Sequence, residues 1–197
     1  MRNNVITFLV GLLLTFPVYA DWYREEAAIM GTAISVELWS EKPAEGRALT
    51  QSVLDEMRRI DRLMSTWRSD SEISRVNAQA ARRPVTVSAE LLVLVERALA
   101  YSVMTDGAFD ITYASAGKHY DYRAGKKPDA TQLADALPAI DYRHVSVDKD
   151  NATLRFLREG VRIDLGGIAK GYAVDRCIEL LADAGITHAL VSAGGDT

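Results

Sequence analysis

The sequence has very little cysteine and histidine, with one cysteine, Cys177, and three histidines among its 197 residues. A single thiol excludes an internal disulfide framework and any zinc or iron–sulfur site built from several cysteines. The histidines, His119, His144 and His188, lie too far apart to show the spacing of a zinc site. Neither sign of charge is in large excess. The net charge of −4 disfavours a general nucleic-acid binder, which needs a basic face.

Long hydrophobic runs are missing except near the start of the chain. Residues 5–16 are apolar, follow the basic residue Arg2, and precede an A-x-A-like site that ends at Ala20. The run is too short to span a bilayer comfortably and has the organisation of a secretory signal peptide. An uncleaved anchor helix is the alternative. The sequence therefore predicts a cleaved signal peptide over residues 1–20 and a secreted domain over residues 21–197.

The remaining composition is that of an ordinary globular protein, with 48% hydrophobic and 25% charged residues. These proportions exclude disordered, collagen-like and low-complexity architectures. The length is enough for one domain with a sizeable core. We expect Cys177 to lie in that core, because it falls within an apolar helical pattern.

Apolar residues recur at helical spacing in several segments. Ser88 and Thr131 are placed to cap two of these helices, and Gly185 to end the last one. The helices are expected over residues 43–64, 88–105, 131–137 and 168–184.

Strand patterns lie between the predicted helices. Alternating apolar residues predict a strand over residues 28–39, in which Gly31 indicates a bulge or a close backbone approach. Residues 144–147 and 153–156 flank a turn sequence and predict a hairpin. Further strands are expected over residues 161–165 and 188–192. This mixture predicts an α+β fold with a mixed, largely antiparallel sheet and packed helices, rather than a doubly wound sheet.

The segment with the clearest chemistry is DLGGIAKGYAVD, which starts at Asp164. Two glycines follow the carboxylate, and Lys170 lies in the first turn of the predicted helix. Free N–H groups and the positive dipole end at a helix start suit a phosphate or pyrophosphate, which glycines let approach closely. The pattern is neither a Walker A nor a G-x-G-x-x-G motif. A tight strand-to-helix turn with a solvated lysine is the alternative interpretation.

Three further clusters are candidates for a binding site. Phe109 beside Asp110 is suited to hold a flat heterocycle; alternatively, the ring is core and the carboxylate caps a turn. Trp67 follows the first long helix and is placed to stack on a ring system; alternatively, it plugs the core and Ser71 begins a short helix. Residues 192–196 form a glycine turn that either lines a cleft or closes a hairpin.

Five motifs, taken in order, resemble one family. They are MGTxxxV, IDRLMSTWRSDSEISRVN, GAFDIT, DLGGIAKGYAVD and SAGGD, spread over residues 30–196. This order resembles the ApbE family, the FAD:protein FMN transferases, over nearly all of the chain after the signal peptide. The resemblance implies an ApbE-like, T-fold-related architecture. It also implies a location in the periplasm, which agrees with the predicted secretion.

The resemblance implies a Mg²⁺-dependent transfer of FMN from FAD to a threonine hydroxyl of a target protein, with release of AMP. The implied targets are flavin-accepting subunits of membrane redox complexes, with peripheral membrane association and no nucleic acid. By the resemblance, Asp164 meets the adenosine end, Lys170 faces the phosphates, and the carbonyl of Gly167 ligates Mg²⁺. The residues implied to bind FAD are Met30, Trp67, Ala108, Phe109, Asp110, Asp164 and Lys170. The resemblance assigns no catalytic base in this chain.

Other readings of the same site remain open. With water in place of threonine, the protein would be an FAD pyrophosphatase; without metal ligands, it would be a non-catalytic periplasmic FAD-binding protein. Family members are longer, and the chain ends at a glycine turn that normally leads to a returning element. We therefore expect a C-terminally truncated member whose absent part carries the remaining Mg²⁺ ligands. On this expectation the chain alone is inactive and leaves residues 188–192 as an exposed sheet edge.

Overall fold

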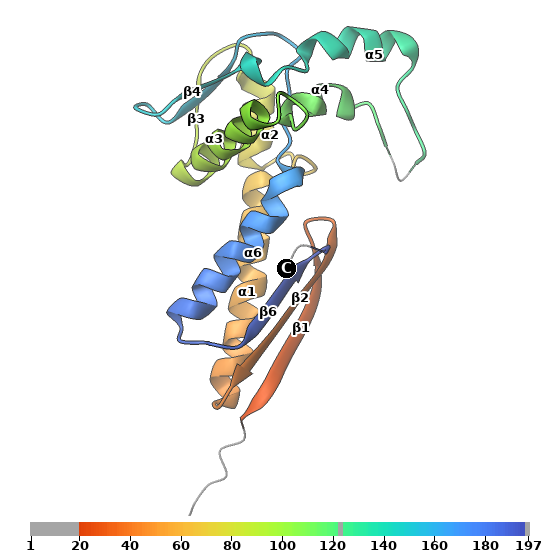
Figure 1. The fold of residues 1–197 in the computed structure, drawn as a ribbon. Helices are drawn as coiled ribbons and strands as arrows, with labels where there is room; N and C mark the ends of the chain where they lie inside the picture. Colours follow the sequence, from red (N-terminus) through yellow and green to blue (C-terminus); the bar gives the residue numbers. More distant parts are fainter. Residues whose placement is uncertain (1–19, 122–123, 196–197) are drawn as a thin grey trace, which may run out of the picture.

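The computed structural model describes residues 20–121 and 124–195. The predicted signal peptide lies outside the described residues except for Ala20. Figure 1 shows two long helices beside a sheet in one part of the molecule, and shorter helices with a small sheet in the other. Both described sheets are antiparallel. The predicted α+β class is therefore confirmed.

The first sheet has the strand order β1-β2-β6. These strands are β1 (Asp21–Ile29), β2 (Thr32–Ser40) and β6 (Ala189–Ala193). Along β2, Ile34, Val36 and Leu38 point into the core and are at most 1% exposed. Their alternation with polar residues is what predicted this strand. Among the described strands, β6 pairs with β2 alone and leaves its other side as a sheet edge, as expected.

The predicted strand over residues 28–39 is wrong at its start. The chain forms a hairpin there, because Met30 and Gly31 have φ angles of 55° and 73° and lie between the paired residues Ile29 and Thr32. Two consecutive positive φ angles make the tight turn that matches the twist of a hairpin, so Gly31 marks neither a bulge nor a close approach. The preceding strand β1 exposes most of its side chains and shows no apolar alternation.

Two long helices cover one face of this sheet, α1 (Pro43–Met64) and α6 (Gly166–Asp183) (Figure 1). The predicted apolar face of α1 is buried. Cys177 on α6 is fully buried, as expected, and its Sγ lies 3.7 Å from the carbonyl oxygen of Val53. Burial raises the pKa of the Cys177 thiol to about 12, so the group stays protonated and acts as core.

The other part of the molecule packs short elements around α3 and a small sheet of order β3-β5-β4. Its helices are α2 (Glu72–Gln79), α3 (Ala89–Met104), α4 (Ala114–Gly117) and α5 (Ala130–Ala136), with 3₁₀ turns η1 (Ile111–Tyr113), η2 (Leu137–Ala139) and η3 (Tyr142–His144). Its strands are β3 (Val85–Thr86), β4 (Val145–Asp148) and β5 (Thr153–Phe156). The predicted hairpin of β4 and β5 is confirmed.

The predicted cap of α5 is wrong by two residues. Asp129, not Thr131, caps this helix, because its side chain accepts from the N–H of Gln132 while the Gln132 side chain accepts from the N–H of Asp129. This reciprocal pair satisfies two backbone donors at once, which a lone threonine cannot do.

Residues 161–165 form no strand, which corrects the prediction made for them. Side chains and one backbone bond, from the N–H of Asp164 to the carbonyl oxygen of Ile111 at 3.0 Å, hold the segment instead of a neighbouring strand. The Asn77 amide bonds both backbone groups of Ile163, and the Ser115 hydroxyl accepts from the N–H of Arg162 at 3.0 Å. Apolar residues still alternate along the segment, so its pattern matches that of a strand.

In the part of the chain that the structure describes, no helix has both the length and the apolar character needed to cross a membrane.

Candidate functional site

The carboxylate of Asp164 joins the end of α1 to the start of α6. Its Oδ2 accepts a hydrogen bond of 2.6 Å from the Thr66 hydroxyl, and its Oδ1 accepts one of 2.6 Å from the N–H of Gly166. A carboxylate at a helix start offsets the positive end of the helix dipole and occupies one free N–H group. The predicted residue Asp164 therefore lies at the helix start that the sequence singled out.

The glycine pair allows close packing at this helix start. A Cβ on Gly166 would lie 2.8 Å from Oδ1 of Asp164, and one on Gly167 would lie 3.1 Å from Cε2 of Phe109. Side chains at either position would push these partners away. The structure thus brings together three predicted residues, Asp164, Gly167 and Phe109.

Lys170 contributes a positive charge to the same place. Its Nζ donates to the carbonyl oxygen of Gly166 at 3.2 Å, so the ammonium group folds back over the first turn of α6. The amide dipoles and this cation point to one anion-binding corner. Both interpretations of the sequence allow a lysine at this place, so the phosphate site stays a prediction.

Phe109 packs against the helix start, and Trp67 is the chain neighbour of Thr66, which bonds Asp164. Trp67 directly follows Thr66 and is 85% exposed, so the alternative that it plugs the core is wrong. Phe109 is half-buried and contacts Tyr101 edge-on, with ring centroids 6.2 Å apart. Ser71 does cap a short helix, α2, as the alternative expected. An exposed tryptophan beside a charged helix start leaves an aromatic face available for a planar ligand.

Asp110 is engaged within the protein. Its Oδ1 accepts from both the N–H and the hydroxyl of Thr112, at 2.7 and 2.6 Å, and its Oδ2 accepts from the N–H of Tyr142 at 2.9 Å. The carboxylate therefore caps a turn, as the alternative interpretation held. Ala108 is exposed beside it. Both residues lie next to Phe109, so the predicted FAD-binding trio stays together.

Met30 lies at the hairpin tip between β1 and β2. This tip borders an open cavity of about 620 Å³ whose lining includes Met30, Arg58 and Asp61. The Gly194 turn lies against the same tip, because its N–H donates to the carbonyl oxygen of Ala33 at 3.0 Å. Figure 1 shows the tip at the same end of the sheet as the start of α6. Asp196, the last residue of the predicted terminal cluster, lies outside the described residues.

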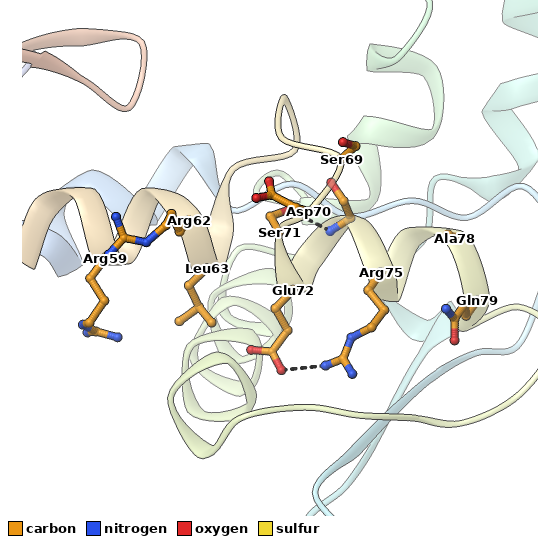
Figure 2. Close-up of a pocket in the computed structure, with 11 residues that line it drawn as sticks. Arg59, Arg62, Leu63, Ser69, Asp70, Ser71, Glu72, Arg75, Ala78 and Gln79 are labelled. Carbon is orange, nitrogen blue, oxygen red and sulfur yellow. Dashed lines mark hydrogen bonds and ion pairs between the residues drawn. The ribbon is translucent and has the colours of Figure 1, made fainter.

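A second cavity of about 750 Å³ lies between the end of α1 and α2 (Figure 2). None of the predicted site residues lines it. Its wall includes an ion pair of 2.9 Å between Glu72 and Arg75, drawn as a dashed line in Figure 2. Since these charges already satisfy each other, we place the candidate site at the start of α6.

A cluster of charged and polar side chains links α6 to α1 and α3. Arg59 bonds Glu56 at 2.8 Å and Glu90 at 2.6 Å, and the Tyr172 hydroxyl donates to Glu90 at 2.7 Å. The Arg59 guanidinium lowers the pKa of Glu56 and Glu90, while burial and the bond to Glu90 raise the pKa of Tyr172 to about 12. All four groups therefore keep their charge state near neutral pH.

The described residues do not form a metal site by themselves. No group of three histidine, cysteine or acidic side chains is close enough within residues 20–121 and 124–195 to hold a metal ion. Both oxygens of Asp164 already accept hydrogen bonds. The implied Mg²⁺ ligand, the carbonyl of Gly167, is one oxygen in the first turn of α6. The described residues therefore do not fit a complete magnesium site.

Sequence reasoning assigned no role to Thr66 or Asn77. Thr66 holds Asp164, and Asn77 holds Ile163, across 98 and 86 positions of the chain. Both lie in the motif that contains Trp67. Asn77 lies on α2, and the other buried residues of this helix are Ile73 and Val76. A polar residue among these apolar ones was the one signal in the sequence that Asn77 has a partner.

The fold and this corner define an α+β protein whose helix start, glycine pair and lysine suit a phosphorylated ligand. The ApbE family model matches residues 30–197. The chain therefore belongs to the ApbE family.

Relatives and solved structures agree with this membership. The chain is 31% identical to the FAD:protein FMN transferase of Treponema pallidum (strain Nichols), over 88% of this chain and 50% of that protein. It is 30% identical to the FAD:protein FMN transferase of Klebsiella pneumoniae (strain 342), over 88% of this chain and 54% of that protein. The flavin transferase ApbE from Vibrio cholerae superposes with a TM-score of 0.80 at 26% identity, over 90% of this chain and 58% of that one. The chain thus spans about half the length of the curated relatives that it matches.

Proposed function

We propose that this protein takes part in the transfer of FMN from FAD to a threonine hydroxyl of a target protein, with release of AMP. The observation that carries the proposal is the corner at the start of α6, where Asp164, Lys170 and two glycines meet the ring of Phe109. The relatives' names supply the reaction class, because they are FAD:protein FMN transferases.

The residues at this corner fit the parts of FAD. The positive end of the α6 dipole and the ammonium group of Lys170 would bind the pyrophosphate. Trp67, which is 85% exposed, and Phe109 would offer their rings to a planar heterocycle. Asp164 would face the adenosine end. The remaining proposed contacts with FAD are Met30, Ala108 and Asp110.

In the proposed reaction the threonine oxygen of the acceptor bonds to the phosphorus of the FMN half, and the bridging P–O bond breaks. AMP leaves with the electron pair of that bond, and the hydroxyl proton passes to solvent or to a base. Lys170 and the helix dipole hold the negative phosphates in place while charge moves between their oxygens. Mg²⁺ dependence belongs to the proposal as well: the carbonyl of Gly167 would be one ligand, the others would come from outside the described residues, and the cation would neutralise such charge.

The setting of the reaction is also part of the proposal. The signal-peptide pattern of residues 1–20 supports a periplasmic location. Flavin-accepting subunits of membrane redox complexes are the proposed targets, which would place the protein at the membrane surface by peripheral association.

The experiment is to measure AMP release from FAD with Mg²⁺, with and without a threonine-containing acceptor protein, and to weigh the acceptor by mass spectrometry. Transfer predicts AMP release that needs the acceptor. The mass of the acceptor should then rise by that of one FMN moiety, joined through its phosphate. AMP release without an acceptor would identify an FAD pyrophosphatase instead. FAD binding without AMP release would identify a non-catalytic binding protein only if a chain extended to the length of the relatives released no AMP either, because this chain spans about half of their length.

A further inference from the structure

Asn77 is a buried polar side chain for which the proposed function has no use. It lies on α2, with 9% of its surface exposed. Its Nδ2 donates to the carbonyl oxygen of Ile163 at 2.9 Å, and its Oδ1 accepts from the N–H of Ile163 at 2.8 Å. One side chain thus satisfies both backbone groups of a single residue, as a neighbouring strand does in a sheet.

The clamped residue lies in the middle of an alternating segment. Val161, Ile163 and Leu165 are at most 2% exposed, whereas Arg162 and Asp164 are only half-buried. Successive side chains of an extended chain point to opposite sides, so a clamp that holds Ile163 inward also holds Asp164 outward. A slip of one residue would turn the Asp164 carboxylate into the core.

This clamp adjoins the proposed FAD-binding corner. Asp164 follows Ile163 directly, and its Oδ1 accepts from the N–H of Gly166, where α6 begins. The backbone position of Ile163 therefore contributes to where the carboxylate and the start of α6 point, together with the bonds of Asp164 to Ile111 and Thr66. Two other bonds hold the segment: the Ser115 hydroxyl accepts from the N–H of Arg162, and the N–H of Asp164 donates to the carbonyl oxygen of Ile111 at 3.0 Å.

We propose that Asn77 is a positioning residue for the FAD-binding corner. It touches no substrate, because it is buried, and it acts through the backbone of Ile163 on Asp164 and the start of α6. The inference rests on the proposed function, since it requires that this corner binds FAD.

The first test replaces the amide by an apolar side chain of similar size, Asn77→Leu. This variant leaves the N–H and carbonyl of Ile163 without partners, and we expect an about 10- to 100-fold weaker FAD affinity. Exchange of the Ile163 amide hydrogen, followed by NMR, should speed up as well. The matched control is Val36→Ala, a buried change in β2. It should lower the melting temperature and leave FAD affinity unchanged.

A second variant keeps the test valid if Asn77→Leu folds poorly. In Asn77→Asp, the protonated acid has the donor and acceptor of the amide, whereas the carboxylate has acceptors only. Burial and the facing carbonyl of Ile163 raise the pKa of the new carboxyl. The FAD affinity of Asn77→Asp relative to the unaltered protein should therefore recover as the pH falls from about 7.5 to about 5.

The outcomes separate the two proposals. Loss of affinity in Asn77→Leu, with recovery of Asn77→Asp at low pH and none of this loss in Val36→Ala, would support the positioning role. Equal loss of affinity in Asn77→Leu and Val36→Ala, or an Asn77→Asp affinity independent of pH, would overturn it. No FAD binding by the unaltered protein would instead contradict the proposed function on which the inference rests.

Discussion

The hydroxyl of Thr66 donates a 2.6 Å hydrogen bond to Oδ2 of Asp164, although the two residues lie 98 positions apart in the chain. This bond fastens the loop after α1 to the residue that precedes α6. Trp67, the next residue along, is thereby held beside the helix start with its ring exposed. The aromatic and the charged parts of the proposed FAD-binding corner are therefore coupled through one hydroxyl group.

Replacing this hydroxyl tests the coupling. Thr66→Val keeps the side-chain shape but removes the donor, so Asp164 loses one of its two partners. We expect a loss of about 1–2 kcal/mol in the free energy of unfolding, measured by urea denaturation, together with weaker FAD binding. Thr86→Val is the matched control, because Thr86 is exposed on β3. An equal loss of FAD affinity in both variants would contradict the role of the Thr66 bond.

The exposed ring of Trp67 should matter for binding and not for folding. Because its side chain is 85% exposed, Trp67→Ala should change the free energy of unfolding by no more than about 0.5 kcal/mol. Stacking of an aromatic ring on a base contributes about 1–3 kcal/mol, so FAD affinity should fall by about 5- to 150-fold. Trp22→Ala, at an exposed tryptophan that contacts Trp39, should leave FAD affinity unchanged. Flavin fluorescence titration measures both variants.

The cluster of Arg59, Glu56 and Glu90 should make stability depend on pH. Hydrogen bonds from Arg59 lower the pKa of both carboxyls below their ordinary value of 4.5. Groups with a lowered pKa in the folded state stabilise it fully above the unfolded pKa, and this contribution disappears as the pH falls through the folded pKa. Urea denaturation should therefore show stability falling below pH 4.5.

A variant pair isolates the cluster. Arg59→Met should lower the free energy of unfolding at neutral pH by about 1 kcal/mol, since the pairs are partly exposed, and should flatten the acid dependence. Arg24→Met removes an ion pair whose side chains are both 63% exposed and should have almost no effect. A steep acid dependence that survives in Arg59→Met would show that other carboxylates cause it.

The long elements of the fold could be predicted because their patterns are local. In β2, apolar residues face α1 and α6, so the alternation was visible in the sequence. The preceding strand β1 could not be found this way, because it exposes residues such as Trp22 and Glu26. The segment around Ile163 has the apolar alternation of a strand but is held by side chains and by a single backbone bond at Asp164. Sequence alternation does not distinguish this arrangement from a strand.

The chemistry of the site was visible only in part. Two glycines and Lys170 at a helix start form a local pattern with a known physical use, and the structure brings Phe109 onto Gly167 as well. Thr66 and Asn77 could not be predicted, because each acts on a partner far away in the chain. Asp110 could be singled out from the sequence as a site residue, but in the structure its carboxylate caps a turn.

The most direct test of the account is an equilibrium titration of the protein with FAD, with and without Mg²⁺, followed by flavin fluorescence. Riboflavin, which lacks the phosphates, serves as the control ligand, and circular dichroism confirms that the protein is folded. The account predicts saturable FAD binding, much weaker riboflavin binding, and a loss of FAD affinity in Lys170→Met. A folded protein that binds no FAD, or that binds FAD and riboflavin equally well, would contradict a pyrophosphate site at the start of α6.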